Sequence, residues 1–201
     1  MKIAIVLNSG TPVTGKIDAD KTICADGGLR YCPVRPDYLV GDLDSLGEAP
    51  EGIPLLKHDS HKNFTDGESA VYFAKELGAD EVVFYGVTGG RYDHFLGNLA
   101  VMSLAMKLGM RPVALDASAE IYGVSAKLNP EFSFGADVGE TFSIVPHGGD
   151  ATVTAARGVE YPLENLTLTG CDTRGISNVA LAPRVSFTLL SGEVFVVRNR
   201  T

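Results

Sequence analysis

The first half of the chain repeats one pattern, in which a short apolar run ends in glycine or acidic residues. In the clearest case, residues 38–40 are followed by Gly41 and then by Asp42 and Asp44. Short apolar runs bounded by turn residues are typical of buried β-strands. Segments of helical period separate several of these runs. Alternating strands and helices predict a mostly parallel, Rossmann-like sheet with flanking helices.

The expected elements divide the chain into two domains. We expect strands at residues 3–7, 21–25, 38–40, 53–57, 81–87 and 111–115, and helices at residues 66–77 and 94–108. Later strands are expected at residues 141–145, 151–155, 166–169, 185–190 and 194–197. Frequent turns between these later strands predict a smaller antiparallel β-sandwich or barrel. The sequence therefore predicts an α/β domain at residues 1–118 and a β-rich domain at residues 119–201.

Charge and cysteine content exclude several classes of function. The 17 basic and 25 acidic residues give a net charge of −8, and an acidic surface repels nucleic acid. No apolar run reaches the length of about 18 residues that indicates a membrane-spanning helix. Cys24, Cys32 and Cys171 are odd in number and lack C-x-x-C spacing, which argues against a zinc site. They are typical of reduced thiols in a cytoplasmic protein.

Asp42 and Asp44 stand two residues apart at the carboxyl end of a predicted strand. Ligands bind at that end of the strands in open α/β sheets. Two carboxylates repel each other unless a cation lies between them, and Mg²⁺ takes one or two carboxylates together with water and phosphate oxygens. The alternative is a solvated acidic turn.

A third carboxylate, Asp66, opens the predicted helix at residues 66–77. Thr65 and Glu68 form a capping box, and Asp66 in the first turn would complement the helix dipole. This structural interpretation explains Asp66 without a metal. A third acid at a third strand–helix junction nevertheless favours a metal ligand.

Two glycine-rich segments follow other predicted strands. Asp26-Gly27-Gly28 provides backbone N–H groups that could face a phosphate or sugar, although this segment alone favours an ordinary strand-to-helix turn.

The second segment runs from Gly89 and Gly90 through Arg91 to Asp93 and His94. Arg91 is suited to bidentate phosphate contacts. Asp93 could orient Arg91 or His94, or accept a proton from a substrate hydroxyl. In the structural alternative, Asp93 is the N-cap of the next helix and His94 is solvated.

Taken together, these motifs resemble the thiamine pyrophosphokinase family. The resemblance lies at residues 25–28, 36–45, 65–66 and 89–94 with Asn98, and more weakly at residues 158–163 and 175–178. It covers nearly the whole chain in order and spacing. The resemblance implies a homodimer that uses Mg²⁺ to transfer the pyrophosphoryl group of ATP to thiamine, releasing AMP. It also implies an ATP-binding α/β catalytic domain and a β-rich domain that binds thiamine and supports dimerisation.

The resemblance assigns roles to individual residues. The catalytic residues it implies are Asp42, Asp44, Asp66, Arg91 and Asp93, of which the first three bind Mg²⁺. The residues expected near the nucleotide are Asp26, Gly27, Gly28, Asn63, Gly89, Gly90 and His94. Ser177 and Asn178 match the family motif near thiamine.

The chain departs from the family pattern at two places. Asn63 stands where members commonly carry another acid, which leaves the number of metal ions open. The chain has no tryptophan to stack on thiamine, so we expect Tyr92, Phe64 or an aromatic residue of the partner subunit in that role. Two alternatives stay open: a pyrophosphokinase of the same fold acting on another heteroaromatic alcohol, such as a hydroxymethyl pterin, and a non-catalytic nucleotide-binding module.

Overall fold

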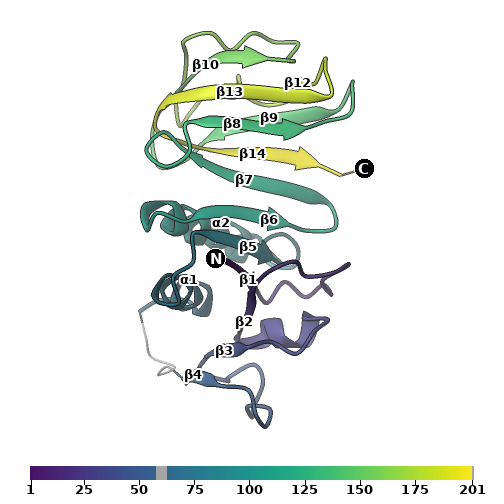
Figure 1. Cartoon of the computed structure of the whole chain (residues 1–201), viewed down its shortest axis with the longest axis vertical. Helices are drawn as coiled ribbons and strands as arrows, with labels where there is room; N and C mark the ends of the chain where they lie inside the picture. Colours follow the sequence, from purple (N-terminus) through teal and green to yellow (C-terminus); the bar gives the residue numbers. More distant parts are fainter. Residues whose placement is uncertain (58–62, 201) are drawn as a thin grey trace. The chain divides into compact units, whose positions relative to one another are not determined.

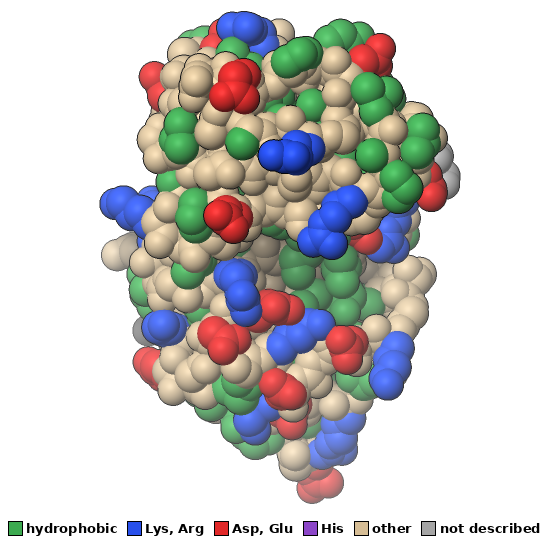
Figure 2. All heavy atoms as spheres, turned by 45° about the horizontal axis from the view of Figure 1, so that its top comes forward, with side chains coloured by type: hydrophobic (Ala, Val, Ile, Leu, Met, Phe, Trp, Pro, Cys, Tyr) green, Lys and Arg blue, Asp and Glu red, His purple; other side chains and the backbone are tan. Residues whose placement is uncertain are grey.

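A computed structural model describes residues 1–57 and 63–200 (Figure 1). The chain divides into two compact units, Met1–Ala117 and Ser118–Thr201. Within the described ranges, no helix is long and apolar enough to span a membrane. On the face drawn in Figure 2, acidic and basic side chains are interspersed, so that face shows no continuous basic stripe of the kind that binds nucleic acid.

The first unit is built on a parallel sheet with the strand order β6-β5-β1-β2-β3-β4. Its strands are β1 (Lys2–Val6), β2 (Lys21–Ala25), β3 (Tyr38–Gly41), β4 (Leu55–Lys57), β5 (Glu81–Tyr85) and β6 (Arg111–Leu115). The unit also contains a 3-10 helix, η1 (Asp26–Tyr31), and the helices α1 (Asp66–Glu76) and α2 (Tyr92–Lys107). Each strand and helix that the sequence predicts for this half is present.

The strand order reverses direction at β1. The chain adds β2, β3 and β4 on one side of β1, and then places β5 and β6 on the other side. The connections that leave neighbouring strands on either side of such a point diverge, and a crevice opens at the carboxyl ends of the strands. This order predicts where a ligand site in the first unit should lie.

The second unit is an antiparallel β-sandwich, as the sequence predicts. One sheet has the order β12-β9-β14-β7 and the other the order β11-β10-β13-β8. The strands are β7 (Ala119–Ser125), β8 (Glu131–Gly135), β9 (Thr141–Pro146), β10 (Ala151–Arg157), β11 (Leu166–Leu168), β12 (Asn178–Val179), β13 (Arg184–Ser191) and β14 (Glu193–Asn199).

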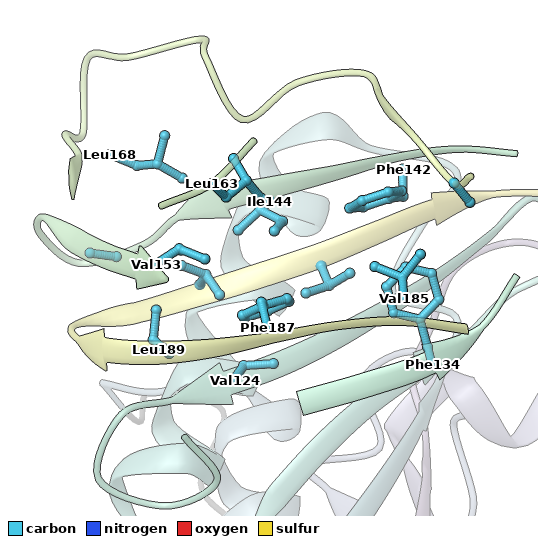
Figure 3. Close-up of a cluster of buried hydrophobic side chains, with 14 residues drawn as sticks. Val124, Phe134, Phe142, Ile144, Val153, Leu163, Leu168, Val185, Phe187 and Leu189 are labelled. Atoms are coloured by element: carbon cyan, nitrogen blue, oxygen red, sulfur yellow. The ribbon is translucent and has the colours of Figure 1, made fainter. Parts of the chain in front are cut away.

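Alternate residues of these strands point into one apolar core (Figure 3). Val185, Phe187 and Leu189 of β13 are buried while the residues between them are partly exposed. They pack with Phe142 and Ile144 of β9, which belongs to the other sheet. This period of two is what joins the two sheets face to face.

The sequence misses β7, β8 and β12. Gly123 interrupts the apolar pattern of β7, and glycine is disfavoured inside strands. The strand nevertheless pairs with β14 from Ala119 to Ser125. Pairing with β14, which is distant in the sequence, therefore outweighs the low strand preference of Gly123.

We expect Gly175→Ala to destabilise the second unit strongly. A Cβ atom at position 175 would lie 2.0 Å from the carbonyl oxygen of Ile144, whose N–H donates a 2.8 Å hydrogen bond to the Gly175 oxygen. Overpacking of this kind typically costs about 1–3 kcal/mol. Gly170→Ala is a matched control five residues away, where an added Cβ meets nothing within 4 Å. Urea denaturation should give a lower midpoint for Gly175→Ala alone, and equal midpoints would contradict the packing.

Candidate active site

The carboxyl ends of β1, β2, β3 and β5 open into one pocket of about 720 Å³, lined by residues of the first unit. It lies where the reversal of strand order predicts a crevice. Among the residues that the sequence singles out, those that line it include Asp26, Asp42, Asp44, Phe64, Asp66, Gly90, Arg91, Asp93, His94 and Asn98.

Three of these acids converge closely. Oxygen atoms of Asp26, Asp42 and Asp66 lie within 4.8 Å of one another. Asp26 is only 4% exposed, and within the described part of the chain its Oδ1 has no hydrogen-bond partner. Burying a carboxylate oxygen without a hydrogen-bond partner costs free energy, and a bound cation would remove that cost. The three carboxylates are hard oxygen donors of the kind that Mg²⁺ prefers.

Gly41 allows the acids to approach one another. It ends β3 with a φ of +156°, and a Cβ atom there would lie 2.9 Å from Asp26 Cβ and 3.3 Å from Asp66 Oδ1. Asp26 itself has a φ of +39°, a conformation that Asp tolerates better than most residues. The backbone conformations of Gly41 and Asp26 therefore allow the three carboxylates to lie close together.

The closest group of acids differs in one residue from the metal ligands that the sequence predicts. Asp44 lines the pocket but lies outside the closest group of three, and Asp26 takes part in its place. The Asp44 N–H donates to Asp42 Oδ1 at 3.0 Å, and the Ser45 hydroxyl lies 3.1 Å from Asp44 Oδ1. Leu43 between the two acids has a φ of +70°, so the chain turns sharply there. The role of Asp44 as a direct metal ligand stays a prediction.

Both interpretations of Asp66 are compatible with the geometry. Thr65 caps α1 and accepts a hydrogen bond from the Glu68 N–H at 3.2 Å. Asp66 stands in the first turn, as the helix-dipole explanation requires, and its carboxylate also belongs to the acidic group. The cap is made by the Thr65 hydroxyl and does not depend on Asp66.

Arg91 and Asp93 form a bidentate pair on the pocket wall. Arg91 Nε donates to Asp93 Oδ1 at 3.0 Å and Arg91 Nη2 donates to Oδ2 at 2.5 Å. Asp93 also accepts the His94 N–H at 3.0 Å. The N-cap of α2 is Arg91, so the alternative that placed Asp93 at the cap is wrong: the helix already begins at Tyr92. The pair instead orients the guanidinium group.

This pairing bears on the roles predicted for Asp93. The hydrogen bond from Arg91 lowers the pKa of Asp93 from 3.8 to about 2. A carboxylate with so low a pKa is a weak proton acceptor near neutral pH. The geometry therefore favours Asp93 as the group that orients Arg91 over Asp93 as a general base.

We expect the Asp93 carboxyl to titrate near pH 2. Because its pKa is depressed in the folded state, the pair contributes stability that is fully present above pH 3.8 and is lost as the pH falls through about 2. Carbon-13 NMR of the side-chain carboxyl measures this midpoint directly. Arg91→Gln should move it back toward 3.8, and a wild-type midpoint already at that value would show that the pair does not form in solution.

The glycines of the two glycine-rich segments serve close packing. A Cβ atom at Gly27 would lie 2.4 Å from Asn8 Nδ2, and one at Gly90 would lie 2.9 Å from the Ser9 oxygen. A Cβ atom at Gly28 would lie 2.2 Å from the Val6 oxygen. Both segments thus press against the end of β1 and the loop that follows it. Contact of their N–H groups with a phosphate stays a prediction.

Sequence reasoning missed the loop after β1. Asn8, Ser9 and Gly10 all line the pocket, and Ser9 is buried with its hydroxyl donating to the Thr11 oxygen at 3.1 Å. The sequence suggests only a turn here, because the loop carries no charged group. Its position directly after a predicted strand, shared with the other clusters, was the available signal.

The remaining candidates lie outside this pocket. Asn63 and Tyr92 do not line it, and Tyr92 is 87% exposed. In the second unit, Ser177 is exposed with a φ of +59°. Asn178 is 4% exposed, and its amide accepts the Tyr161 N–H at 3.1 Å and donates to the Tyr161 oxygen at 3.0 Å. Asn178 therefore fixes the backbone at Tyr161.

Comparison with known families explains this combination of pocket and sandwich. The family model described as the catalytic domain of thiamin pyrophosphokinase matches residues 16–113. The model described as its vitamin B1 binding domain matches residues 128–193. The chain belongs to the thiamin pyrophosphokinase family. The order of the two family domains is the order of the two units.

Relatives and solved structures of the thiamin pyrophosphokinase family agree. The thiamine pyrophosphokinase of Bacillus subtilis is 29% identical over 83% of this chain and 79% of the relative. Thiamine pyrophosphokinase 1 of Oryza sativa is 24% identical over 98% of this chain and 86% of the relative. The crystal structure of the Bacillus subtilis enzyme gives a TM-score of 0.84 at 27% identity and covers the whole of both chains. The Candida albicans enzyme shares the fold, with a TM-score of 0.76 at 14% identity over 99% of this chain and 89% of that one.

Proposed function

We propose that this chain transfers the pyrophosphoryl group of ATP to the hydroxyl of thiamine, forming thiamine diphosphate and AMP. The observation that carries the proposal is the convergence of Asp26, Asp42 and Asp66 in a pocket that also contains Arg91. Membership of the family supports thiamine as the acceptor. The relatives from Bacillus subtilis and Oryza sativa, both thiamine pyrophosphokinases, agree with it.

Phosphoryl-group transfer requires positioning and charge neutralisation more than covalent chemistry from the protein. The residues that would hold Mg²⁺ are Asp26, Asp42 and Asp66, and the orphaned Asp26 oxygen fits that role. When bound, Mg²⁺ would neutralise phosphate charge and align the transferred group. Asp44 stays a predicted metal ligand in this proposal, and its backbone N–H also orients Asp42.

Arg91 supplies the other charge at the phosphates. Asp93 engages its Nε and Nη2 atoms, which leaves the Nη1 hydrogens for a phosphate oxygen. A guanidinium fixed in advance stabilises developing negative charge without reorganisation during the reaction. The polar loop at Asn8 and Ser9 lies across the same pocket and is suited to hydrogen bonds with the nucleotide.

The division of labour between the units is also a proposal. We assign ATP and Mg²⁺ to the Rossmann-like unit, and thiamine binding and dimerisation to the sandwich with Ser177 and the Asn178-supported loop. Homodimer formation through the sandwich is supported by its exposed apolar side chains Val138, Tyr161 and Leu181, which are 66%, 57% and 57% exposed. The free cysteines support a cytoplasmic location.

The test is AMP release that depends on an added alcohol. Purified protein with ATP and Mg²⁺ should form AMP and thiamine diphosphate in equal amounts when thiamine is present, and no AMP when it is absent. AMP release with a hydroxymethyl pterin but not with thiamine would favour the second acceptor. Nucleotide binding without any AMP under all these conditions would show a non-catalytic module and overturn the proposal.

A further inference from the structure

The turn at Gly86–Thr88, which leads from β5 into the Gly89–Arg91 segment, is held by side chains from two other elements. Asp116, directly after β6, accepts the Gly86 N–H on Oδ1 at 2.6 Å and the Thr88 N–H on Oδ2 at 2.6 Å. Asn98 of α2 donates its amide to the Val87 oxygen at 3.1 Å. Three consecutive residues of the turn are therefore fixed from outside it.

The Asp116 carboxylate takes the place that an anionic ligand could occupy at the N–H groups of this turn. N–H groups at a glycine-containing turn form a small concave site of the kind that binds phosphate oxygens. Here the carboxylate of Asp116 already occupies the N–H groups of Gly86 and Thr88. These two donors are therefore used to hold the turn, and any phosphate contact falls to the residues that follow it.

The turn is also pressed against the loop after β1. Gly86 has a φ of +78°, and a Cβ atom there would lie 2.8 Å from the Leu7 oxygen and 2.9 Å from Ser9 Oγ. A shift of the turn would therefore move the Ser9 wall of the pocket and the segment that carries Arg91 together. The two charge-assisted hydrogen bonds to Asp116 oppose such a shift.

We propose that Asp116 is a positioning residue for pyrophosphoryl transfer, which acts by fixing the Gly86–Thr88 turn so that Arg91 faces the phosphates. The inference rests on the proposed function, because Arg91 needs a fixed place only if charge develops beside it. Misplacement of a catalytic group by about 1 Å can cost 10²-fold in rate. The Asp116 carboxylate would act on the substrate indirectly, through the backbone of the Gly86–Thr88 turn.

The test compares Asp116→Asn with a matched control, Asp37→Asn. Asp37 also accepts a backbone N–H, from Thr22 at 2.8 Å, but it precedes β3 and so lies at the opposite, amino end of the strands. We expect Asp116→Asn to lower kcat by about 10- to 100-fold with little change in the KM for thiamine. Asp37→Asn should lower the melting temperature at most and leave kcat unchanged.

A double-mutant cycle with Arg91→Gln separates positioning from simple stabilisation. If Asp116 acts through Arg91, adding Asp116→Asn to Arg91→Gln should cost much less activity than it does in the wild type. Full additivity, or a kcat for Asp116→Asn equal to that of the Asp37→Asn control, would overturn the inference. If Asp116→Asn does not fold, Asp116→Glu, which keeps the carboxylate but moves it, is assayed in its place. A kcat for Asp116→Glu equal to that of the Asp37→Asn control would again overturn the inference. Wild-type protein that releases no AMP would instead count against the proposed function itself.

Discussion

Asp26→Asn is expected to lower turnover by about 10²-fold or more, because it removes one of the three charges of the close acidic group. The Asp26 carboxylate is buried, has an oxygen without a hydrogen-bond partner in the described chain, and lies against Asp42 and Asp66. In metal-free buffer the melting temperature should stay level or rise, since one of three mutually repelling carboxylates becomes neutral. Turnover at saturating Mg²⁺ and an apo-protein melt measure the two effects separately.

Asp44→Asn is the informative partner of this variant. Asp44 lies in the same pocket but outside the closest group, and its backbone N–H, which orients Asp42, survives the substitution. We therefore expect a smaller loss of turnover than for Asp26→Asn. Equal losses for the two variants would place Asp44 among the metal ligands and contradict the ordering that the geometry implies.

Gly41→Ala is expected to raise the Mg²⁺ concentration needed for half-maximal activity by about 10- to 100-fold. Substitutions of residues that position metal ligands typically weaken metal binding to this extent. The added Cβ would lie 2.9 Å from Asp26 Cβ and 3.3 Å from Asp66 Oδ1, and would push two of the three acids apart. A titration of activity against Mg²⁺ measures the effect. The added Cβ would meet atoms of Asp26 and Asp66, so the change should appear chiefly in the metal dependence.

Gly47→Ala controls for backbone strain in that experiment. Gly47 has a φ of +81°, but an added Cβ there meets nothing within 4 Å. It should cost stability without altering the Mg²⁺ dependence. If Gly41→Ala and Gly47→Ala showed the same Mg²⁺ dependence, crowding of the acids would not be the reason for glycine at position 41.

The sequence predicts which side chains come together in the pocket, because parallel strands end at one edge of a sheet. Asp42 follows the end of a predicted strand, and Asp66 opens a predicted helix. Both belong to the close acidic group, as expected. The place of Asp26 could not be read in the same way. It depends on β2 lying beside β3 in the sheet and on the positive φ of Asp26, neither of which is visible in local composition.

The glycines show the opposite limit. Their presence after strands is consistent with phosphate binding, but Gly28 and Gly90 are required by close contacts with the backbone of Val6 and Ser9. Asn8 and Ser9 carry no charge, so no local signal marks them as pocket residues. Asp116 is similar, because its partners Gly86 and Thr88 lie about thirty residues earlier in the chain. Such roles follow from tertiary contacts alone.

The central claim, that Asp26 helps to hold the metal, is tested most directly by Mn²⁺ binding. Electron paramagnetic resonance reports free Mn²⁺ during a titration of the protein with a non-hydrolysable ATP analogue present. The account predicts that Asp26→Asn binds Mn²⁺ about 10-fold or more weakly than the wild type, with a smaller change for Asp44→Asn. Equal Mn²⁺ affinity in the wild type and Asp26→Asn would place the metal elsewhere and contradict the account.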